Sequence, residues 1–576
     1  MKSIGLVVIT VVLAARLAAG EIQEKGWWRN AVFYQVYPRS FMDSDGDGDG
    51  DLNGITSKLE HFNDLGVTAI WLSPINTSPE VDMGYDISDF RDINPRFGTM
   101  QDLRNLLKKA KKLGIKVILD LVPNHTSDKH EWFQKSLDMN GKYADYYIWA
   151  NCVKNGNVTT PPNNWVSVFN GTAWTWHEKR KQCYFHQFYP QQPDLNYNNP
   201  DVQEEMKEIM RFWLNVGIDG FRIDAVPHLF ENKTLANEPV KSVTGAGKDD
   251  FVSRDHIYTK DQPDTYKLVQ SWRDFVDEYA KNENTSEKVL LTEAYTTLNN
   301  TLHYYKYGSN VPFNFNFIVG ASATSNATDF KTIIDNWIAG TPSGDVPNWV
   351  MGNHDRTRIG TRYPDREDQM VMLEMILPGV AVTYYGEEIG MVDNTKINRT
   401  NGDFRDGCRT PFQWNNSISA GFSSNPITWL PVNENYETLN LETEKTDPDS
   451  HYNIYKSLIK LRNSTLLKDG SLQTTVLKDL VLAVVRKDSK ESAALLINFN
   501  NNSSVTVDLS GLMEHAKAEL AMSSFKSGLK RNATYVLTNI TIPAKASMIL
   551  IASSGSSIAY SMVTVSLALC VLIFRM

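Results

Sequence analysis

The chain has 576 residues, which is too many for one compact core, so at least two domains are expected. Its formal net charge is −9, and it carries no basic stripe that could neutralise phosphates, which argues against a nucleic-acid partner. The apolar and charged fractions, 41% and 22%, are those of an ordinary globular protein.

The first 20 residues have the pattern of a secretory signal peptide. An apolar run follows one lysine and ends in small residues, so the mature chain is expected to begin at Glu21. Secretion fits the Asn-x-Ser/Thr sequons, which include Asn76, Asn170 and Asn532 among others. We therefore expect an extracellular glycoprotein.

An acidic loop follows the first predicted strand, residues 31–41. The stretch 43–54 reads DSDGDGDGDLNG, with aspartates at every second position and glycine between most of them. A hard cation would offset this repulsion, because Ca²⁺ accepts about six to eight oxygens from a flexible loop. Position twelve is Gly54 where an EF-hand needs glutamate, so the pattern predicts a calcium loop but not an EF-hand. The alternative is a solvated acidic turn.

One structural unit recurs along the chain, an amphipathic helical pattern that ends at glycine and is followed by a short apolar strand. Gly66, Gly114 and Gly217 lie where a left-handed C-cap is expected. Looser versions continue further along the chain. About eight strands between Val32 and Glu388, alternating with helices, predict a (β/α)₈ barrel rather than an open sheet.

A loop-rich segment interrupts this alternation after the third strand. Cys152 and Cys183 flank loop-rich sequence there and are expected to form a disulfide in an oxidising compartment. Cys408 is then a free thiol, since Cys570 lies in the C-terminal tail.

The sequence changes in texture after Leu466, where alternating short strands separated by turn residues predict a small antiparallel β-domain. The segment 553–576 has small residues, a weakly polar spacer and an apolar tail, which is the order of a GPI-anchor signal. A single retained transmembrane helix is the alternative. In both cases we expect a protein tethered to the outer face of the plasma membrane.

Reactive side chains gather at the predicted strand ends, where barrel chemistry takes place. They are Asp120 and His125 after the third strand, Arg222, Asp224 and His228 after the fourth, Glu293 after the fifth, and His354 and Asp355 after the seventh. Any one of these groups alone fits an ordinary salt bridge or helix cap. The whole set predicts a catalytic site, and no HxH or HExxH spacing supports metal binding by it.

These segments carry a resemblance. DLVPNH, GFRIDAVPH, LLTEAY and GNHD, in that order, resemble the four signature regions of the α-amylase family of glycoside hydrolases. QPDLN, PPNNWVSVFNGTAWTW and DGCRTPFQW resemble its oligo-1,6-glucosidase and maltase branch, and the terminal segments resemble those of insect membrane-anchored maltases of the mosquito larval midgut.

The resemblance implies a (β/α)₈ TIM barrel with an inserted loop-rich domain after the third strand and a C-terminal antiparallel β-domain. The expected divisions are a signal peptide at 1–20, a catalytic barrel at 21–123 and 197–465, an inserted domain at 124–196, a β-domain at 466–552 and the anchor signal at 553–576.

The family also implies roles for particular residues. The catalytic residues are the nucleophile Asp224, the general acid and base Glu293, and the third carboxylate Asp355. The substrate-binding residues are Asp82, Tyr85, His125, Arg222, His354 and Arg409. In the calcium loop, carboxylates come from Asp43, Asp45, Asp47 and Asp51 and a backbone carbonyl comes from Asp49. The Ca²⁺ is expected to brace the loop, and no organic cofactor is expected.

The function implied is that of a retaining, exo-acting α-glucosidase that acts on α-1,4-linked oligosaccharides and sucrose. Ala225, after the nucleophile, favours α-1,4 bonds because the α-1,6 enzymes tend to carry valine there. The alternative is a cell-surface docking glycoprotein on the same scaffold, since anchored mosquito relatives serve as docking sites for a bacterial toxin. The family's transporter-associated heavy chains lose the catalytic carboxylates, which this sequence retains.

Overall fold

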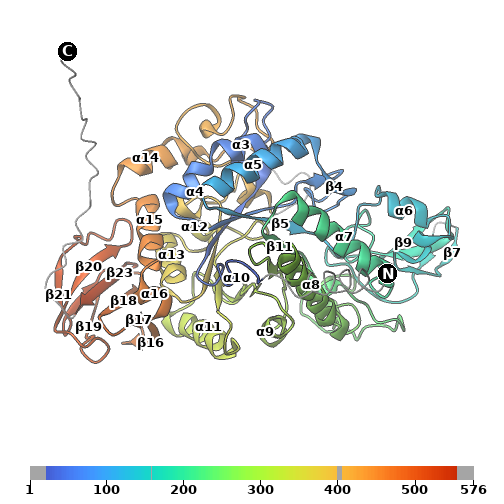
Figure 1. Ribbon diagram of the computed structural model, residues 1–576. Helices are drawn as coiled ribbons and strands as arrows, with labels where there is room; N and C mark the ends of the chain where they lie inside the picture. The colour runs from blue at the N-terminus through green and yellow to red at the C-terminus, as the bar shows by residue number, and fades with distance from the viewer. Residues whose placement is uncertain (1–20, 157, 398–404, 554–576) are drawn as a thin grey trace, which may run out of the picture.

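The computed structural model describes residues 21–156, 158–397 and 405–553 (Figure 1). The predicted signal peptide and almost all of the predicted anchor segment lie outside these residues. Within the part that is described, no helix is both long enough and apolar enough to cross a membrane.

Eight parallel strands form the central barrel, which confirms the predicted fold. They are β1 (Val32–Val36), β2 (Ala69–Leu72), β5 (Lys116–Leu121), β11 (Gly220–Ile223), β12 (Val289–Thr292), β13 (Val311–Pro312), β14 (Asn348–Val350) and β15 (Val380–Tyr384). Their order in the sheet is β13-β12-β11-β5-β2-β1-β15-β14.

The seam between β13 and β14 is closed by a side chain instead of a strand ladder. Asn348 is fully buried, and its amide nitrogen donates to the Pro312 carbonyl at 2.6 Å. Its amide oxygen accepts from the Asn314 backbone N–H at 2.8 Å. A buried backbone group without a partner is costly, so this one amide supplies the bonds that the missing ladder would have made.

Helices surround the barrel and begin and end as the sequence pattern indicates. The longer ones are α4 (Leu59–Leu65), α5 (Met100–Lys112), α7 (Pro200–Val216), α8 (Pro263–Asn282), α9 (Leu298–Lys306), α11 (Ala327–Gly340), α13 (Glu367–Ile376) and α15 (His451–Arg462). The short ones are α2 (Pro38–Phe41), α3 (Leu52–Ser57), α6 (Glu131–Ser136), α10 (Asn316–Val319), α12 (Ile359–Arg362), α14 (Leu441–Thr446) and α16 (Thr465–Asp469). Gly66 and Gly217 are left-handed C-caps with φ of 86° and 116°, as predicted.

The segment between β5 and α7 forms a small domain at one end of the molecule (Figure 1). Its sheet has the order β6-β10-β9, and a separate ribbon pairs β7 with β8. These strands are β6 (Trp149–Ala150), β7 (Val153–Asn155), β8 (Val158–Thr160), β9 (Trp174–His177) and β10 (Gln182–Phe185). A further ribbon, β3 (Asn76–Thr77) with β4 (Asp89–Ile93), follows β2.

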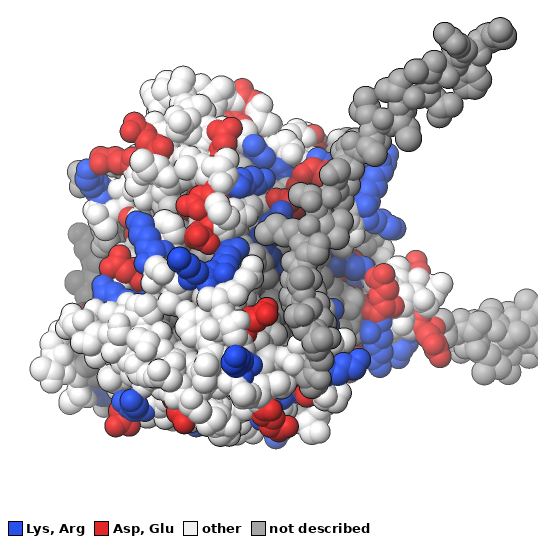
Figure 2. Space-filling model, turned by 90° about the vertical axis from the view of Figure 1, so that its left-hand side faces the viewer, with Lys and Arg blue, Asp and Glu red and all other residues white. Residues whose placement is uncertain are grey.

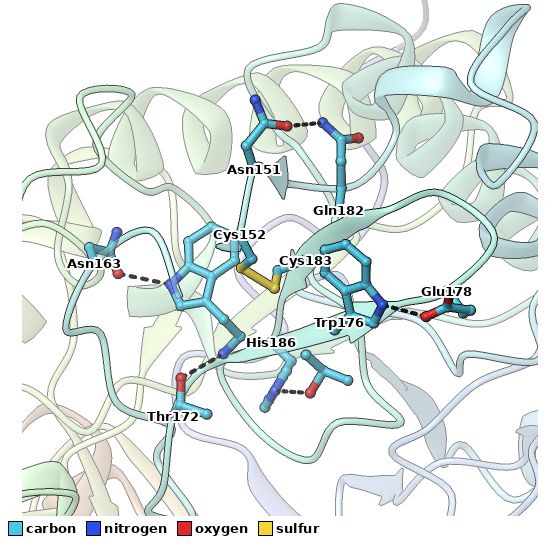
Figure 3. The surroundings of a disulfide bond; sticks show 11 residues. Asn151, Cys152, Asn163, Thr172, Trp176, Glu178, Gln182, Cys183 and His186 are labelled. Carbon is cyan, nitrogen blue, oxygen red and sulfur yellow. Dashed lines mark hydrogen bonds between the residues drawn. A yellow bond between two sulfur atoms is a disulfide. The ribbon is translucent and has the colours of Figure 1, made fainter. Parts of the chain in front are cut away.

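The predicted disulfide between Cys152 and Cys183 is formed, and it joins the segment after β6 to strand β10 (Figure 3). The side chains of Asn151 and Gln182, beside the two cysteines, are also hydrogen bonded at 3.0 Å. The bond therefore ties the peripheral β7–β8 ribbon to the sheet of this domain. Cys408 is a free, buried thiol, as expected.

The C-terminal β-domain lies at the opposite end of the molecule (Figure 1). Its six-stranded sheet has the order β16-β17-β18-β23-β20-β21, beside a β19–β22 ribbon. The strands are β16 (Ser471–Leu477), β17 (Val481–Lys487), β18 (Glu491–Asn498), β19 (Val505–Val507), β20 (Lys517–Ser523), β21 (Thr534–Val536), β22 (Ile540–Ile542) and β23 (Ser547–Ser553). Arg486 is fully buried and donates to the Ile376 carbonyl at 2.8 Å, which attaches this sheet to α13 of the barrel.

The surface charge and one glycosylation sequon bear on the expectations from the sequence. Among the described residues on the face drawn in Figure 2, acidic and basic side chains are interspersed and large areas carry no charge. The sequon at Asn76 is an exception to the expected exposed sites. Asn76 is buried, and its amide nitrogen donates to the Phe90 carbonyl at 2.9 Å, so the folded chain does not present it for glycosylation.

Candidate active site

A cavity of about 390 Å³ opens at the C-terminal ends of the barrel strands. The predicted residues that line it are Asp82, Tyr85, His125, Asp224, Glu293, His354 and Asp355. The other two predicted residues, Arg222 and Arg409, are each 1% exposed; Arg222 contacts the lining carboxyl groups of Asp224 and Glu293, and Arg409 contacts that of Asp355. Barrel closure thus brings the nine predicted residues together from six different strand ends.

Arg222 is the centre of the catalytic cluster. Its guanidinium contacts Asp224 directly, lies 2.8 Å from an oxygen of Asp120 and lies 3.0 Å from Oε2 of Glu293. One positive charge thus faces three carboxyl groups that burial removes from water. Because three adjacent anions would exceed this charge, the geometry favours a proton on one of the carboxyl groups.

The pKa values indicate where that proton resides. Burial raises the pKa of Asp224 to about 7, although Arg222 opposes the shift. Burial raises the pKa of Glu293 further, to about 8, again against Arg222. Glu293 therefore holds its proton to higher pH than Asp224, which suits a general acid beside an ionised nucleophile.

The backbone after the nucleophile is in an unusual conformation. Ala225 has a φ of 48°, in the left-handed region that alanine seldom adopts. Its N–H donates to Oε2 of Glu293 at 2.9 Å. The strained turn thus fixes the relative positions of the nucleophile strand and the general acid, which fits the tendency of such strain to occur at functional sites.

One end of the cavity is closed by ion pairs that include a residue missing from the sequence interpretation. Arg405 lies 2.6 Å from an oxygen of Asp82 and 3.4 Å from Oδ1 of Asp355. Arg409, which was expected to close this end, instead lies behind Asp355 at 3.1 Å and donates to the His354 carbonyl. Arg405 immediately precedes the DGCRTPFQW segment, so its position beside that motif was the available signal.

These arginines also set the charge of Asp355. Burial raises the pKa of Asp355, but the charges of His354, Arg405 and Arg409 outweigh burial and hold the pKa below its usual range. Asp355 is therefore ionised at neutral pH, in contrast to Glu293. The cavity thus contains the ionised carboxylate of Asp355 and the protonated carboxyl group of Glu293.

The two histidines of the site are neutral hydrogen-bonding groups. Burial lowers the pKa of His125 to about 4 and that of His354 to about 3. The Gln35 amide nitrogen lies 2.7 Å from Nδ1 of His354. In the tautomer that fits this contact, Nδ1 accepts the hydrogen bond and Nε2 carries the hydrogen towards Asp355. The His354 ring also stacks on Tyr85, with centroids 5.3 Å apart and planes 5° apart.

The acidic loop forms a separate candidate cation site at the end of β1. Oxygens of Asp43, Asp45 and Asp51 lie within 4.8 Å of one another, and such a set of carboxylate ligands fits a hard cation. The carboxylate of Asp49 turns away to pair with Arg39 and Arg96, which is compatible with a ligand role for its backbone carbonyl only. Asp47 is not part of this cluster, and its carboxylate accepts from the Asp49 N–H at 2.8 Å.

The loop also connects two distant parts of the barrel. The Asp43 carboxylate accepts from the Gly48 N–H at 2.9 Å and from the Ser423 hydroxyl at 2.5 Å. The Asn425 amide donates to the Gly46 carbonyl at 3.1 Å. Ordering of this loop therefore stabilises the part of the segment after β15 that contains Ser423 and Asn425.

Comparison with known proteins identifies the family. Residues 35–470 match the profile described as alpha amylase, catalytic domain. The chain belongs to the alpha-amylase family. It is 47% identical over 511 residues to Maltase 1 of Drosophila virilis, and the aligned region covers 85% of this chain and 80% of that protein. These similarities make the chain a glycoside hydrolase.

Two further relatives show how widely functions differ on this scaffold. The crystal structure of the alpha-glucosyl transfer enzyme XgtA is 32% identical, with a TM-score of 0.79, and covers 91% of this chain and 99% of that one. The amino acid transporter heavy chain SLC3A1 of Homo sapiens is 40% identical over 469 residues, 80% of this chain and 68% of that protein. The function of this chain must therefore be argued from its own site.

Proposed function

We propose that the chain is a retaining, exo-acting α-glucosidase that releases α-glucose from the non-reducing ends of α-1,4-linked oligosaccharides and from sucrose. The observation that carries this proposal is the Asp82–Arg405–Asp355 ion-pair set, which closes the cavity beside the Asp224 and Glu293 pair. A cavity closed at one end admits a chain terminus rather than the middle of a polysaccharide.

The position of the two catalytic carboxyl groups supports retention of configuration. Asp224 and Glu293 bind different nitrogens of the same Arg222 guanidinium. This arrangement keeps them close together, in keeping with the separation of about 5–5.5 Å in retaining enzymes and not the wider spacing that an inverting enzyme needs for its water.

The reaction follows from these charge states. Protonated Glu293 donates its proton to the glycosidic oxygen as the bond to the anomeric carbon breaks, and the Asp224 carboxylate forms an ester with that carbon. Glu293, now ionised, takes a proton from water, which attacks the same carbon and releases Asp224. The ionised Asp355 stabilises the positive charge that develops on the sugar ring in both steps.

The proposal extends to the surroundings of the enzyme. Asp43, Asp45 and Asp51 would hold a Ca²⁺ whose role is to order the loop, since the cluster is separate from the cavity lining. We propose that the chain is displayed at the outer cell surface by a GPI anchor at its C-terminal end. A docking role for a bacterial toxin is compatible with this display, but no described feature favours it over catalysis.

Two measurements on the soluble ectodomain test the proposed activity. Wild type should hydrolyse maltose and release the α-anomer of glucose, which NMR detects before mutarotation. Glu293→Gln should lower kcat by about 10²–10⁴-fold, the usual contribution of a general acid. Release of β-glucose would contradict retention, and unchanged hydrolysis by Glu293→Gln would contradict the catalytic assignment.

A further inference from the structure

The rim of the catalytic cavity carries a glycosylation sequon that the reaction described above does not use. Residues 170–172 read Asn-Gly-Thr, in the loop that precedes β9. Asn170 is exposed, in contrast to the buried Asn76. An exposed asparagine in this motif is an acceptor for an N-linked glycan when the chain passes through the secretory pathway. The fold therefore leaves Asn170 available for this modification.

Asn170 lies between two segments that line the catalytic cavity. Phe169, directly before it, is part of the lining, and so is Phe251 from the segment after β11. The Phe251 N–H donates to Oδ1 of Asn170 at 2.9 Å, and the Gly171 N–H donates to the Asp249 carbonyl at 2.7 Å. The Asn170 side chain thus joins the inserted domain to the barrel at the edge of the cavity.

The two ends of the Asn170 amide have different surroundings. Its Oδ1 accepts the bond from Phe251, whereas its Nδ2 has no hydrogen-bond partner among the residues that the structure describes. N-glycosylation uses the amide nitrogen and leaves the oxygen as an acceptor. A glycan on Nδ2 is therefore compatible with the contact to Phe251, and the two segments need not separate to accommodate it.

The loop that carries Asn170 is held in place from the cavity side. The Phe169 ring packs against Tyr189 and Phe188, with centroids 4.4 Å and 5.6 Å away. The guanidinium of Arg405, which closes one end of the cavity, lies over the same ring at 5.6 Å. Asn170 itself is not part of the cavity lining, so a glycan attached to it begins outside the cavity, beside its wall.

We propose that Asn170 carries an N-linked glycan that shields the opening of the catalytic cavity against large, branched α-glucans, an inference that rests on the proposed α-glucosidase function. In the transfer, Nδ2 loses a proton and forms a bond to C1 of the N-acetylglucosamine at the reducing end of a lipid-linked oligosaccharide. The bond from that carbon to the lipid diphosphate breaks, and the lipid diphosphate leaves with the bonding electrons. The hydrated glycan then occupies space that a branched polysaccharide needs, whereas maltose is small enough to pass.

The first test is the occupancy of Asn170 in the full-length chain expressed in insect cells. Mass spectrometry should find the peptide that contains Asn170 with a glycan attached to it. An unmodified Asn170 would overturn the proposal.

Two variants remove the glycan by different routes. Asn170→Asp keeps the oxygen acceptor for Phe251 and tolerates the left-handed backbone at φ 69°, but it has no amide nitrogen to modify. Thr172→Ala keeps Asn170 and removes the hydroxyl that the sequon requires, whereas Thr172→Ser retains a hydroxyl. Asn532→Asp is the matched control, because Asn532 is also an exposed Asn-x-Thr sequon with a positive φ, of 60°, and lies on the C-terminal β-domain.

The kinetic test compares kcat/KM for glycogen with kcat/KM for maltose. Without the glycan on Asn170 this ratio should rise about tenfold through faster association with glycogen, since association rates among related complexes vary over about one to three decades. The kcat values and kcat/KM for maltose should stay unchanged, and Asn532→Asp and Thr172→Ser should keep the wild-type ratio. A wild-type ratio in both Asn170→Asp and Thr172→Ala, with loss of the glycan confirmed by mass spectrometry, would overturn the shielding.

Binding separates this inference from the proposed function. If wild type hydrolyses no α-glucoside, the proposed function fails, and the occupancy of Asn170 still decides whether the site is modified. Co-sedimentation with glycogen then decides the shielding. The Asn170→Asp chain should co-sediment with glycogen to a greater extent than wild type, and equal co-sedimentation would overturn the shielding.

Discussion

Replacement of Arg405 by alanine tests the ion-pair set that closes the catalytic cavity. In the wild-type chain the Arg405 and Asp82 side chains are 9% and 6% exposed and lie 2.6 Å apart. Without the guanidinium, Asp82 retains the Gln192 amide at 3.1 Å, which provides a hydrogen bond but no opposite charge. Asp355 is less affected, because it retains Arg409 at 3.1 Å and is partly exposed.

The expected magnitude follows from this difference between the two carboxylates. Removing one partner of a buried pair costs about 3–5 kcal/mol, because the other charge remains buried and uncompensated. Among the described residues, Asp82 loses its cationic partner and Asp355 keeps one, so the lower limit of about 3 kcal/mol applies. If that loss falls on transition-state binding, kcat/KM for maltose decreases by about 10²-fold.

The assay measures kcat/KM per folded molecule, together with thermal unfolding. Arg273→Ala is the control, because Arg273 is 7% exposed and pairs with Asp277 at 2.5 Å on α8, outside the cavity. The control should lower Tm but leave kcat/KM of the folded enzyme unchanged. If Arg405→Ala loses less than threefold in kcat/KM, or loses only stability as the control does, the end wall does not organise the substrate and the reasoning is wrong.

Three further predictions follow from the charges and the chain ends. Because the acid form of Glu293 is required and burial raises its pKa to about 8, kcat/KM should fall as pH rises through about 8, and a profile flat to pH 10 would contradict the assignment. Ca²⁺ that binds only the folded chain should raise Tm. The Asp45→Ala variant should lose this increase in Tm, whereas the Asp47→Ala variant should keep it. An equal Tm in chelator and in Ca²⁺ would count against the site. A phosphatidylinositol-specific phospholipase should release the protein from cell membranes, whereas retention with the segment 553–576 detected by mass spectrometry would indicate a transmembrane helix.

The repeating unit of the barrel could be predicted from local patterns alone. Apolar residues at helical spacing define each helix, and Gly66 and Gly217 end two of them because only glycine adopts the left-handed C-cap at little cost. Short apolar runs define the strands. Since catalytic groups of a barrel occupy strand ends, the sequence alone identifies Asp224 and Glu293 as candidates.

Other features depend on contacts between residues far apart in the chain. Asn348 reads as an ordinary strand residue, and only barrel closure shows that its amide replaces the missing ladder between β13 and β14. Asp49 belongs to the same acidic repeat as Asp45, but Arg39 and Arg96 draw its carboxylate away. A local sequence pattern shows which residue types occur in each element, whereas the register of the folded strands determines which side chains contact one another.

The sequence by itself determined the barrel, the β-domain, the disulfide pair and the residue types of the catalytic site. Tertiary structure alone decided that Arg222 is shared by three carboxyl groups, that Glu293 keeps its proton, and that Arg405 closes the cavity. The physical reason is that helical and strand periodicity act over a few residues and are visible in sequence. Burial, charge sharing and pKa arise only when the chain brings distant groups within a few ångströms and excludes water from them.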